Sequence, residues 1–279
     1  MRRIHPTAVV DPAAELGDDV EVGPHAVVDG PVRLGAHCVL MAHATVLGET
    51  TLGEGNVVFP GAVIGAAPQD LKHRGEPTRL VVGARNQIRE HVTFHRGTAK
   101  GGGLTTVGSD GLFMVGCHVA HDCVVGDRVI LANHVLLAGH VTVQERAILN
   151  GAAACHHFTT IGRLAYVGGL SRITRDIPPF AVAEGHPVRI RGANVVGMQR
   201  SGIPAEVVDR VEDAVRDIFV RGVETARDAM ARLEREHPGD ALLRELIAFT
   251  RASEAGRSGR QAEPRPGVEA TPAVRPAAS

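Results

Sequence analysis

Residues 28–65 read VDGPVRLGAHCVLMAHATVLGETTLGEGNVVFPGAVIG, and every sixth residue of this stretch is Val, Leu or Ile. The spacing extends in both directions, with interruptions after residues 64 and 94, and after the second one it resumes one residue out of phase. The residues in register are Ile4, Val10, Leu16, Val22, Val28, Leu34, Leu40, Val46, Leu52, Val58, Ile64, Val82, Ile88, Phe94, Val107, Phe113, Val119, Val125, Leu131, Leu137, Val143, Leu149, Cys155, Ile161, Val167 and Ile173. Eleven consecutive hits, from Ile4 to Ile64, exclude chance spacing in a Val- and Leu-rich chain.

A period of six matches neither an α-helix, with about 3.6 residues per turn, nor a single strand, with a period of about two. It predicts an all-β solenoid: a parallel β-helix of triangular section, in which each hexad forms one short strand and one turn. Three hexads make one coil, and the 26 positions in register predict about nine coils. Glycine often follows the recurring residue, as at Gly17, Gly35 and Gly53, and we expect it to supply the backbone freedom of a tight corner.

The interruptions and the end of the series divide the chain. In the first interruption the positions in register are Asp70 and Glu76, whose carboxylates cannot face an apolar core unpaired, so residues 65–81 should form a loop. Residues 95–106, with three successive glycines, should form another. A β-helix domain over 1–190 is then followed by a small α-helical domain over 191–251, which has an apolar stripe at helical spacing. Residues 252–279 are expected to be a disordered tail.

The composition narrows the classes of function. The formal net charge of −1 provides no basic field for nucleic acid. No apolar run approaches the ~20 residues of a transmembrane helix, so no integral membrane association is expected. The four cysteines form no CxxC pair and no secretory leader opens the chain, which predicts a reduced, cytoplasmic setting.

Residues 118–123, HVAHDC, begin a group of polar residues that continues through the next coils. In a coil of three hexads, positions 18 residues apart stack about 4.8 Å apart along the axis. Two neighbouring columns result: His121, Gly139 and His157, and beside them Asp122, His140 and Phe158. The missing side chain of Gly139 leaves space and a bare backbone N–H between the two histidines of its column.

Three interpretations of this cluster compete. A zinc site needs three neutral imidazoles that converge on one ion, as in γ-class carbonic anhydrases on the same type of scaffold, whereas here an open glycine separates the histidines of one column. Polar decoration of a solvated face is the favoured interpretation only for His25, His37, His43 and His134. In the third, a neutral imidazole takes a proton from a hydroxyl group while a carboxylate orients it. We favour this general base, expect no bound metal, and expect Cys123 to serve packing.

Seven runs of the sequence resemble the acyl-carrier-protein-dependent UDP-N-acetylglucosamine O-acyltransferases of lipid A biosynthesis. They are PQDLK (68–72), GEPTR (75–79), IREHVTFHRGT (88–98), GGGLT (101–105), HVAHDC (118–123), ANHVLLAGHV (132–141) and GGLSRITRDIPPF (168–180). The runs keep the order of that family over about residues 4–250, and both interruptions fall where the family has its loops.

The resemblance implies a left-handed β-helix and a homotrimer with active sites between subunits. It also implies the first step of lipid A biosynthesis, in which an acyl chain, commonly 3-hydroxyacyl, passes from acyl carrier protein to the 3-hydroxyl of UDP-N-acetylglucosamine. No cofactor is implied, because the acyl-phosphopantetheine on acyl carrier protein is a substrate.

Carried over position by position, the resemblance implies roles for individual residues. His121 matches the general base, Asp122 its supporting acid, and Gly139 the residue whose N–H faces the thioester oxyanion. The positions that match contacts to the sugar, the nucleotide or nearby groups are Gln69, Asp70, Lys72, His118, His140, His156, His157, Asn194 and Arg200. Gly169 matches the position that limits the acyl pocket, where a glycine implies room for a longer chain.

Two positions depart from the family's pattern. His157 stands where Gln is common, and Ser201 where a basic residue often follows Arg200. An imidazole cannot reproduce both hydrogen-bonding faces of an amide, so the nucleotide contact at His157 is in question. The residues leave open the acyl length and the choice between a 3-hydroxyl and a 3-amino acceptor. The related N-acyltransferases usually carry an extra N-terminal uridine-binding domain, whereas the hexads here begin at Ile4, which favours the O-acyltransferases.

Overall fold

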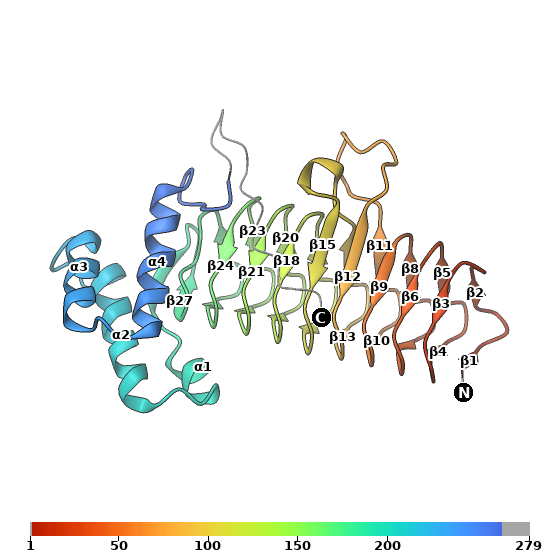
Figure 1. The fold of residues 1–279 in the computed structure, drawn as a ribbon, viewed down its shortest axis with the longest axis horizontal. Coiled ribbons are helices and arrows are strands. Elements are labelled where there is room, and N and C mark those ends of the chain that lie inside the picture. The colour runs from red at the N-terminus through yellow and green to blue at the C-terminus, as the bar shows by residue number, and fades with distance from the viewer. Residues whose placement is uncertain (1, 264–279) are drawn as a thin grey trace.

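The structure, a computed structural model, describes residues 2–263. Its strands β1–β26 are short and parallel and wind into a left-handed β-helix, the long body of the molecule in Figure 1. Every third strand belongs to the same sheet, so the chain passes through three sheets in turn. The predicted all-β solenoid is therefore confirmed.

The three sheets have the following strands, in spatial order. The first contains β1 (Arg3–Ile4), β4 (Glu21–Val22), β7 (Val39–Leu40), β10 (Val57–Val58), β13 (Gln87–Ile88), β16 (Leu112–Phe113), β19 (Ile130–Leu131), β22 (Ile148–Leu149) and β25 (Tyr166–Val167), and it continues beyond β25 with β27 (Ala181–Glu184) and β28 (Arg189–Ala193). The second contains β2 (Val9–Val10), β5 (Val27–Asp29), β8 (Thr45–Leu47), β11 (Val63–Ala66), β14 (Thr93–His95), β17 (His118–Val119), β20 (Leu136–Leu137), β23 (Ala154–Cys155) and β26 (Arg172–Ile173). The third contains β3 (Glu15–Leu16), β6 (Arg33–Leu34), β9 (Thr50–Leu52), β12 (Arg79–Val82), β15 (Leu104–Val107), β18 (Val124–Val125), β21 (Thr142–Val143) and β24 (Thr160–Ile161).

Successive coils stack in the register that the six-residue period predicts. Phe113 pairs with Leu131, the residue 18 positions further along the chain. From Val22 to Ile173 every recurring residue is buried in one continuous apolar core. Ile4 is 46% exposed, because its coil is the first and only one of its faces is covered by another coil.

The corners need backbone freedom at a different position from the one predicted. The left-handed conformation falls at the third residue after the recurring one, for example at His43 (φ 60°), Asp122 (φ 60°) and His134 (φ 58°). The glycine directly after the recurring residue serves close packing instead, because a Cβ on Gly35 would lie 2.6 Å from the backbone of the next coil. The expectation that these glycines form the corner was wrong. Asp and His tolerate the left-handed conformation better than most residues, which accounts for several isolated histidines.

Two loops leave the coils at the corner between the second and third sheets, and Figure 1 shows both projecting on the same side of the body. β11 continues to Ala66 and β12 begins at Arg79, so the first loop spans 67–78 rather than 65–81. β14 ends at His95 and β15 begins at Leu104, so the second spans 96–103 rather than 95–106, and it contains the short 3-10 helix η1 (Ala99–Gly101). The strands are longer than predicted because β11 pairs with β14, and β12 with β15.

A hairpin and four helices follow the last coil. The elements are β27 (Ala181–Glu184), β28 (Arg189–Ala193), α1 (Val195–Arg200), α2 (Ala205–Phe219), α3 (Ala226–Glu236) and α4 (Ala241–Ala255). Apolar faces of the helices form a second core with Leu164 and Phe180 of the last turns. Arg163 and Glu245 join the coil to α4 through two hydrogen bonds of 3.0 and 2.7 Å. Within residues 2–263, no helix has both the length and the apolar character that crossing a bilayer requires.

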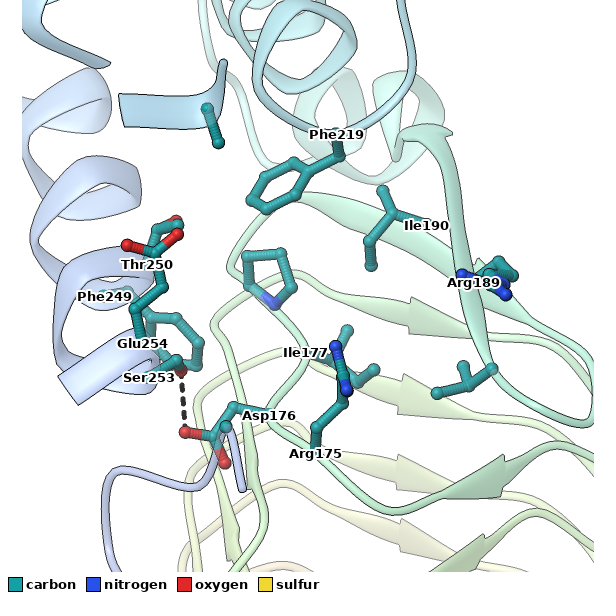
Figure 2. Close-up of a pocket in the computed structure, with 14 residues that line it drawn as sticks. Arg175, Asp176, Ile177, Arg189, Ile190, Phe219, Phe249, Thr250, Ser253 and Glu254 are labelled. Atoms are coloured by element: carbon teal, nitrogen blue, oxygen red, sulfur yellow. Dashed lines mark hydrogen bonds between the residues drawn. The ribbon is translucent and has the colours of Figure 1, made fainter. Parts of the chain in front are cut away.

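The chain does not become a tail at Ala252, as the sequence suggested. α4 continues to Ala255, and residues up to 263 fold back on the last coil. Asp176 anchors this segment, because its Oδ2 accepts hydrogen bonds from the hydroxyl of Ser253 (2.7 Å; Figure 2) and from the N–H of Gln261 (2.8 Å). Polar anchoring thus orders a stretch that is poor in apolar residues. The rest of the predicted tail, residues 264–279, lies outside the described residues.

Candidate active site

The HVAHDC cluster lies at the corner from which both loops project. His121 and Asp122 occupy the turn between β17 and β18, and Gly139 and His140 occupy the turn one coil later, between β20 and β21. The ring of His121 lies against the bare Cα of Gly139. The ring of His140 stacks on that of Phe158, with centroids 4.5 Å apart. The structure therefore contains the two columns that the 18-residue repeat predicts.

His121 and Asp122 form a hydrogen-bonded pair. The imidazole Nδ1 lies 2.8 Å from Asp122 Oδ2, and the two side chains are 11% and 1% exposed. An ionised carboxylate can only accept, so Nδ1 carries the proton that it donates, and in the neutral ring the other nitrogen, Nε2, has the free lone pair. Nε2 is also one of the ring atoms nearest to Gly139. The bond to Asp122 therefore leaves Nε2 as the ring nitrogen that is unpaired by the carboxylate and lies beside the bare glycine.

The second loop holds Asp122 in place. The backbone N–H of Thr98 donates to Oδ1 (2.9 Å) and its hydroxyl donates to Oδ2 (2.7 Å). The N–H of Asp122 itself donates to the hydroxyl of Thr105 (2.8 Å). A Cβ on Gly101 would lie 2.0 Å from the carboxyl carbon, so only glycine fits there. Sequence reasoning missed Thr98 and Gly101 of the second loop and Thr105 of β15; the three successive glycines were the available sign that the loop packs closely against another segment.

These contacts control the charge of the carboxylate. Burial alone would raise the pKa of Asp122, but the hydrogen bonds from His121 and Thr98 together outweigh it and hold the pKa below its usual value. His140 lies with Nε2 3.6 Å from Asp122 Oδ2, and burial lowers the pKa of its ring. At neutral pH the cluster thus has one buried carboxylate beside a neutral His140.

Gly139 is required by the position of His121. A Cβ at this position would lie 2.4 Å from Cε1 and 2.8 Å from Nε2 of the imidazole, closer than real atoms approach. Its N–H makes no hydrogen bond with any residue between 2 and 263. The open backbone position derived from the column is therefore present, and it offers a donor next to the basic nitrogen of His121.

The first loop brings further polar groups to the same corner. The side chain of Asp70 accepts the N–H of Lys72 (2.9 Å), which lowers the pKa of its carboxyl, and the charges of His121 and Lys72 lower it further. Gln69 and Lys72 are exposed. One strand away, His118 Nδ1 is hydrogen-bonded to the hydroxyl of Thr93 (2.7 Å), and burial lowers the pKa of that ring.

One coil beyond Gly139, the histidine pair lies on the surface. His156 and His157 are both exposed, and His156 Nδ1 donates to the backbone carbonyl of His157 (3.0 Å). Gly169 is exposed, and a Cβ there would lie 3.1 Å from the carbonyl oxygen of Gly151, a close but adjustable contact. These residues border the corner without joining the hydrogen bonds of the His121–Asp122 pair.

Asn194 and Arg200 belong to the short helix α1. The side chain of Asn194 caps this helix by accepting the N–H of Gly197 (3.0 Å), and it donates to the carbonyl of Leu164 (2.8 Å). Asn194 is only 8% exposed, and both ends of its side-chain amide are hydrogen-bonded within the same chain. Arg200 is exposed at the end of α1. Within this chain neither residue contacts the histidine cluster.

The zinc interpretation has one point of support. His121, Asp122 and His140 each offer a ligand atom within 4.8 Å of one another. However, Oδ2 of Asp122 already accepts hydrogen bonds from His121 and from Thr98. The group also contains two imidazoles rather than three. Nδ1 of His121 carries the proton that it donates to Asp122, so this nitrogen has no lone pair for a metal. The donors fit a hydrogen-bonded dyad better than a zinc site.

A pocket of about 430 Å³ lies elsewhere, between the last coil, β28 and the helices (Figure 2). Its wall is mainly apolar, with Ile177, Ile190, Phe219 and Phe249, and none of the predicted site residues lines it. The histidine cluster instead lies at the corner from which the two loops project, with His121 and Asp122 buried and His156 and His157 exposed.

Comparisons with known proteins identify the family of this chain. Residues 176–258 match the family described as Udp N-acetylglucosamine O-acyltransferase; Domain 2. The acyl-[acyl-carrier-protein]--UDP-N-acetylglucosamine O-acyltransferase of Myxococcus xanthus is 53% identical over 256 residues, which is 92% of this chain and 99% of that protein. The protein of the same name from an Anaeromyxobacter species is 49% identical, over 91% of this chain and 98% of its own length.

Solved structures give the same result. A UDP-N-acetylglucosamine acyltransferase from Bacteroides fragilis superimposes with a TM-score of 0.85 at 37% identity, covering 89% of this chain and 96% of its own. The Acinetobacter baumannii structure of the same family gives a TM-score of 0.82 at 38% identity, over 88% and 95% of the two chains. This chain belongs to the family of the acyl-[acyl-carrier-protein]--UDP-N-acetylglucosamine O-acyltransferases.

Proposed function

We propose that this protein transfers a (3-hydroxy)acyl chain from acyl carrier protein to the 3-hydroxyl of UDP-N-acetylglucosamine, with His121 as the general base. Nε2 of His121 takes the proton of the 3-hydroxyl while its oxygen attacks the thioester carbonyl. The new C–O bond gives a tetrahedral oxyanion, which the N–H of Gly139 stabilises. The C–S bond then breaks, and the departing phosphopantetheine thiolate takes the proton from the imidazolium.

One observation carries the proposal: the buried carboxylate of Asp122 holds Nδ1–H of His121, so that Nε2 is the basic nitrogen. The carboxylate also stabilises the imidazolium that forms during the reaction. The low pKa of Asp122 keeps it ionised for this task. Thr98 and Gly101 keep the acid from moving, so the base is oriented before the substrate arrives.

The acceptor is proposed to bind beside this pair. Asp70 lies close enough for its charge to affect both His121 and His140, and it is proposed to hold hydroxyl groups of the sugar. The remaining proposed contacts to the sugar nucleotide and nearby groups are Gln69, Lys72, His118, His140, His156, His157, Asn194 and Arg200. The amide of Asn194 can contribute only if it gives up a bond to Gly197 or Leu164. Gly169 is proposed to border the end of the acyl chain.

The same proposal names the partners of the protein, the step it catalyses and its cellular location. Its partners are acyl carrier protein, UDP-N-acetylglucosamine and two further copies of the chain in a homotrimer, whose neighbouring subunits would complete the site. The reaction would be the first step of lipid A biosynthesis, in the cytoplasm, without a cofactor beyond the phosphopantetheine that acyl carrier protein brings.

The test is the variant His121→Ala in a transfer assay with acyl carrier proteins loaded with several chain lengths. We expect loss of transfer by a factor of about 10²–10⁴, the contribution of a positioned base. Binding of UDP-N-acetylglucosamine and the trimer, checked by calorimetry and sedimentation, should remain. Full activity in this variant would refute His121 as the base. Parallel assays with the 3-amino sugar nucleotide decide between ester and amide formation.

A further inference from the structure

His95 is an outward-facing residue that is nevertheless buried. It is the last residue of β14, and its neighbour Phe94 points into the core, so strand alternation places the side chain of His95 on the outer face of the second sheet. It is only 6% exposed. The resemblance and the hydrogen bonds of the His121–Asp122 pair assign it no role.

The ring of His95 packs against the ring of His118. The two rings meet edge to face, with centroids 4.9 Å apart and planes at 88°. The hydrogen bond between His118 Nδ1 and the hydroxyl of Thr93 holds one edge of the imidazole. The ring of His95 adds a second, non-polar contact to the same imidazole. Two contacts therefore fix His118, and its Nε2 is the nitrogen left for a substrate.

The surroundings of His95 suit packing rather than proton transfer. Burial, with the nearby charges of His118 and His121, lowers the pKa of His95 to about 4, so the ring is neutral at physiological pH. Its Nδ1 is buried and has no hydrogen-bond partner within residues 2–263. A protonated ring would leave a buried N–H without an acceptor, which is costly. A neutral ring places only a lone pair at Nδ1 and so avoids burying an unpaired charge.

We propose that His95 is a positioning residue for the acceptor: it holds the plane of His118, so that Nε2 of His118 stays where the sugar nucleotide binds. The inference rests on the proposed function, in which His118 contacts the acceptor. It concerns the shape of the His95 ring and not its nitrogens.

Two variants distinguish the contribution of the His95 ring from that of its nitrogens. His95→Ala removes the ring, and His95→Phe keeps an aromatic ring without nitrogens. We expect His95→Ala to raise the KM for UDP-N-acetylglucosamine about three- to tenfold, the range that freeing one ordered side chain produces, with kcat within about twofold. His95→Phe should restore the KM to within about twofold of the wild type. His5→Ala, at an exposed histidine of the first coil, is the matched control.

A second measurement follows the ring of His118 directly, by NMR titration of the imidazole in the full-length protein. His95→Ala should admit water and raise the pKa of His118 toward its usual value, whereas His95→Phe should not. An unchanged His118 in the alanine variant, or a phenylalanine variant as impaired as alanine, overturns the proposal. Absence of acyl transfer in the wild-type protein would instead refute the proposed function, and the NMR result would still decide the role of His95.

Discussion

Gly139→Ala tests the geometry of the site without removing any polar group. The added Cβ would lie 2.4 Å from Cε1, 2.8 Å from Nε2 and 3.0 Å from Nδ1 of His121. Non-bonded heavy atoms are most favourable at about 3.5–4.0 Å, so the imidazole must move by about 1 Å. A shift of this size away from Gly139 breaks or bends the 2.8 Å bond from Nδ1 to Asp122.

The expected result is a fall in kcat of about 100-fold, the cost of displacing a reacting group by about 1 Å. Gly139 does not have a positive φ, so alanine brings no backbone strain there and the melting temperature should change by no more than a few degrees. Transfer of an acyl chain from acyl carrier protein to UDP-N-acetylglucosamine, followed with circular dichroism on the same samples, measures both quantities.

The matched control is Gly151→Ala, at the same position of the hexad but two hexads further on, in the turn between β22 and β23. A Cβ there would meet only the carbonyl oxygen of Asn133, at 3.5 Å, so the variant should keep wild-type kcat. Wild-type activity in Gly139→Ala would show that the position of His121 is not what the glycine protects. Equal losses in both variants would show that any side chain in these turns is harmful, and would refute the argument as well.

Three other predictions follow from the contacts around the site and the coil end. Thr98→Val removes the hydroxyl that donates to Asp122, so the pKa of this carboxyl should rise toward its usual value, which NMR titration of the carboxyl measures; an unchanged pKa contradicts the role of Thr98. Because the native pKa of Asp122 is depressed, its ionisation stabilises the fold above the unfolded pKa, and that contribution is lost as the pH falls through the native value. Asp176→Ala leaves the N–H groups of Thr160 and Gln261 and the hydroxyl of Ser253 without their acceptor, and thermal unfolding should show a loss of about 1–3 kcal/mol with kcat unchanged. Dialysis against a chelator should leave the transfer rate unchanged, whereas stoichiometric zinc and chelator-sensitive activity would assign the cluster to a metal.

The regular part of the molecule could be predicted because one rule acts on every hexad. A side chain at the recurring position must face the core in each coil, so an apolar residue recurs at all 26 positions in register. The stacking of His121 on Gly139, and of His140 on Phe158, follows from the same repeat. The corner conformation was misassigned to glycine because the sequence shows the frequency of glycine and not its φ.

The loops and the coil end could not be predicted in this way, because they have no period. Nothing in the order of residues connects Thr98 with Asp122, 24 positions away, or Gln261 with Asp176. Likewise, the sequence could not show that the amide of Asn194 is already used as a helix cap. Such contacts depend on where separate segments meet in space, and the polar groups involved have many alternative partners in the unfolded chain.

The sequence by itself determined the solenoid, the corner on which the histidines gather, and the pairing of His121 with a bare Gly139, because each is a consequence of a strict repeat. Only the tertiary structure decided how the base is held: the second loop folds over Asp122, buries its carboxylate and supplies the hydrogen bonds that keep it ionised and in contact with Nδ1 of His121. The physical reason is that a repeat fixes which residues are neighbours along the axis, whereas the orientation and charge of a side chain depend on the groups that close around it.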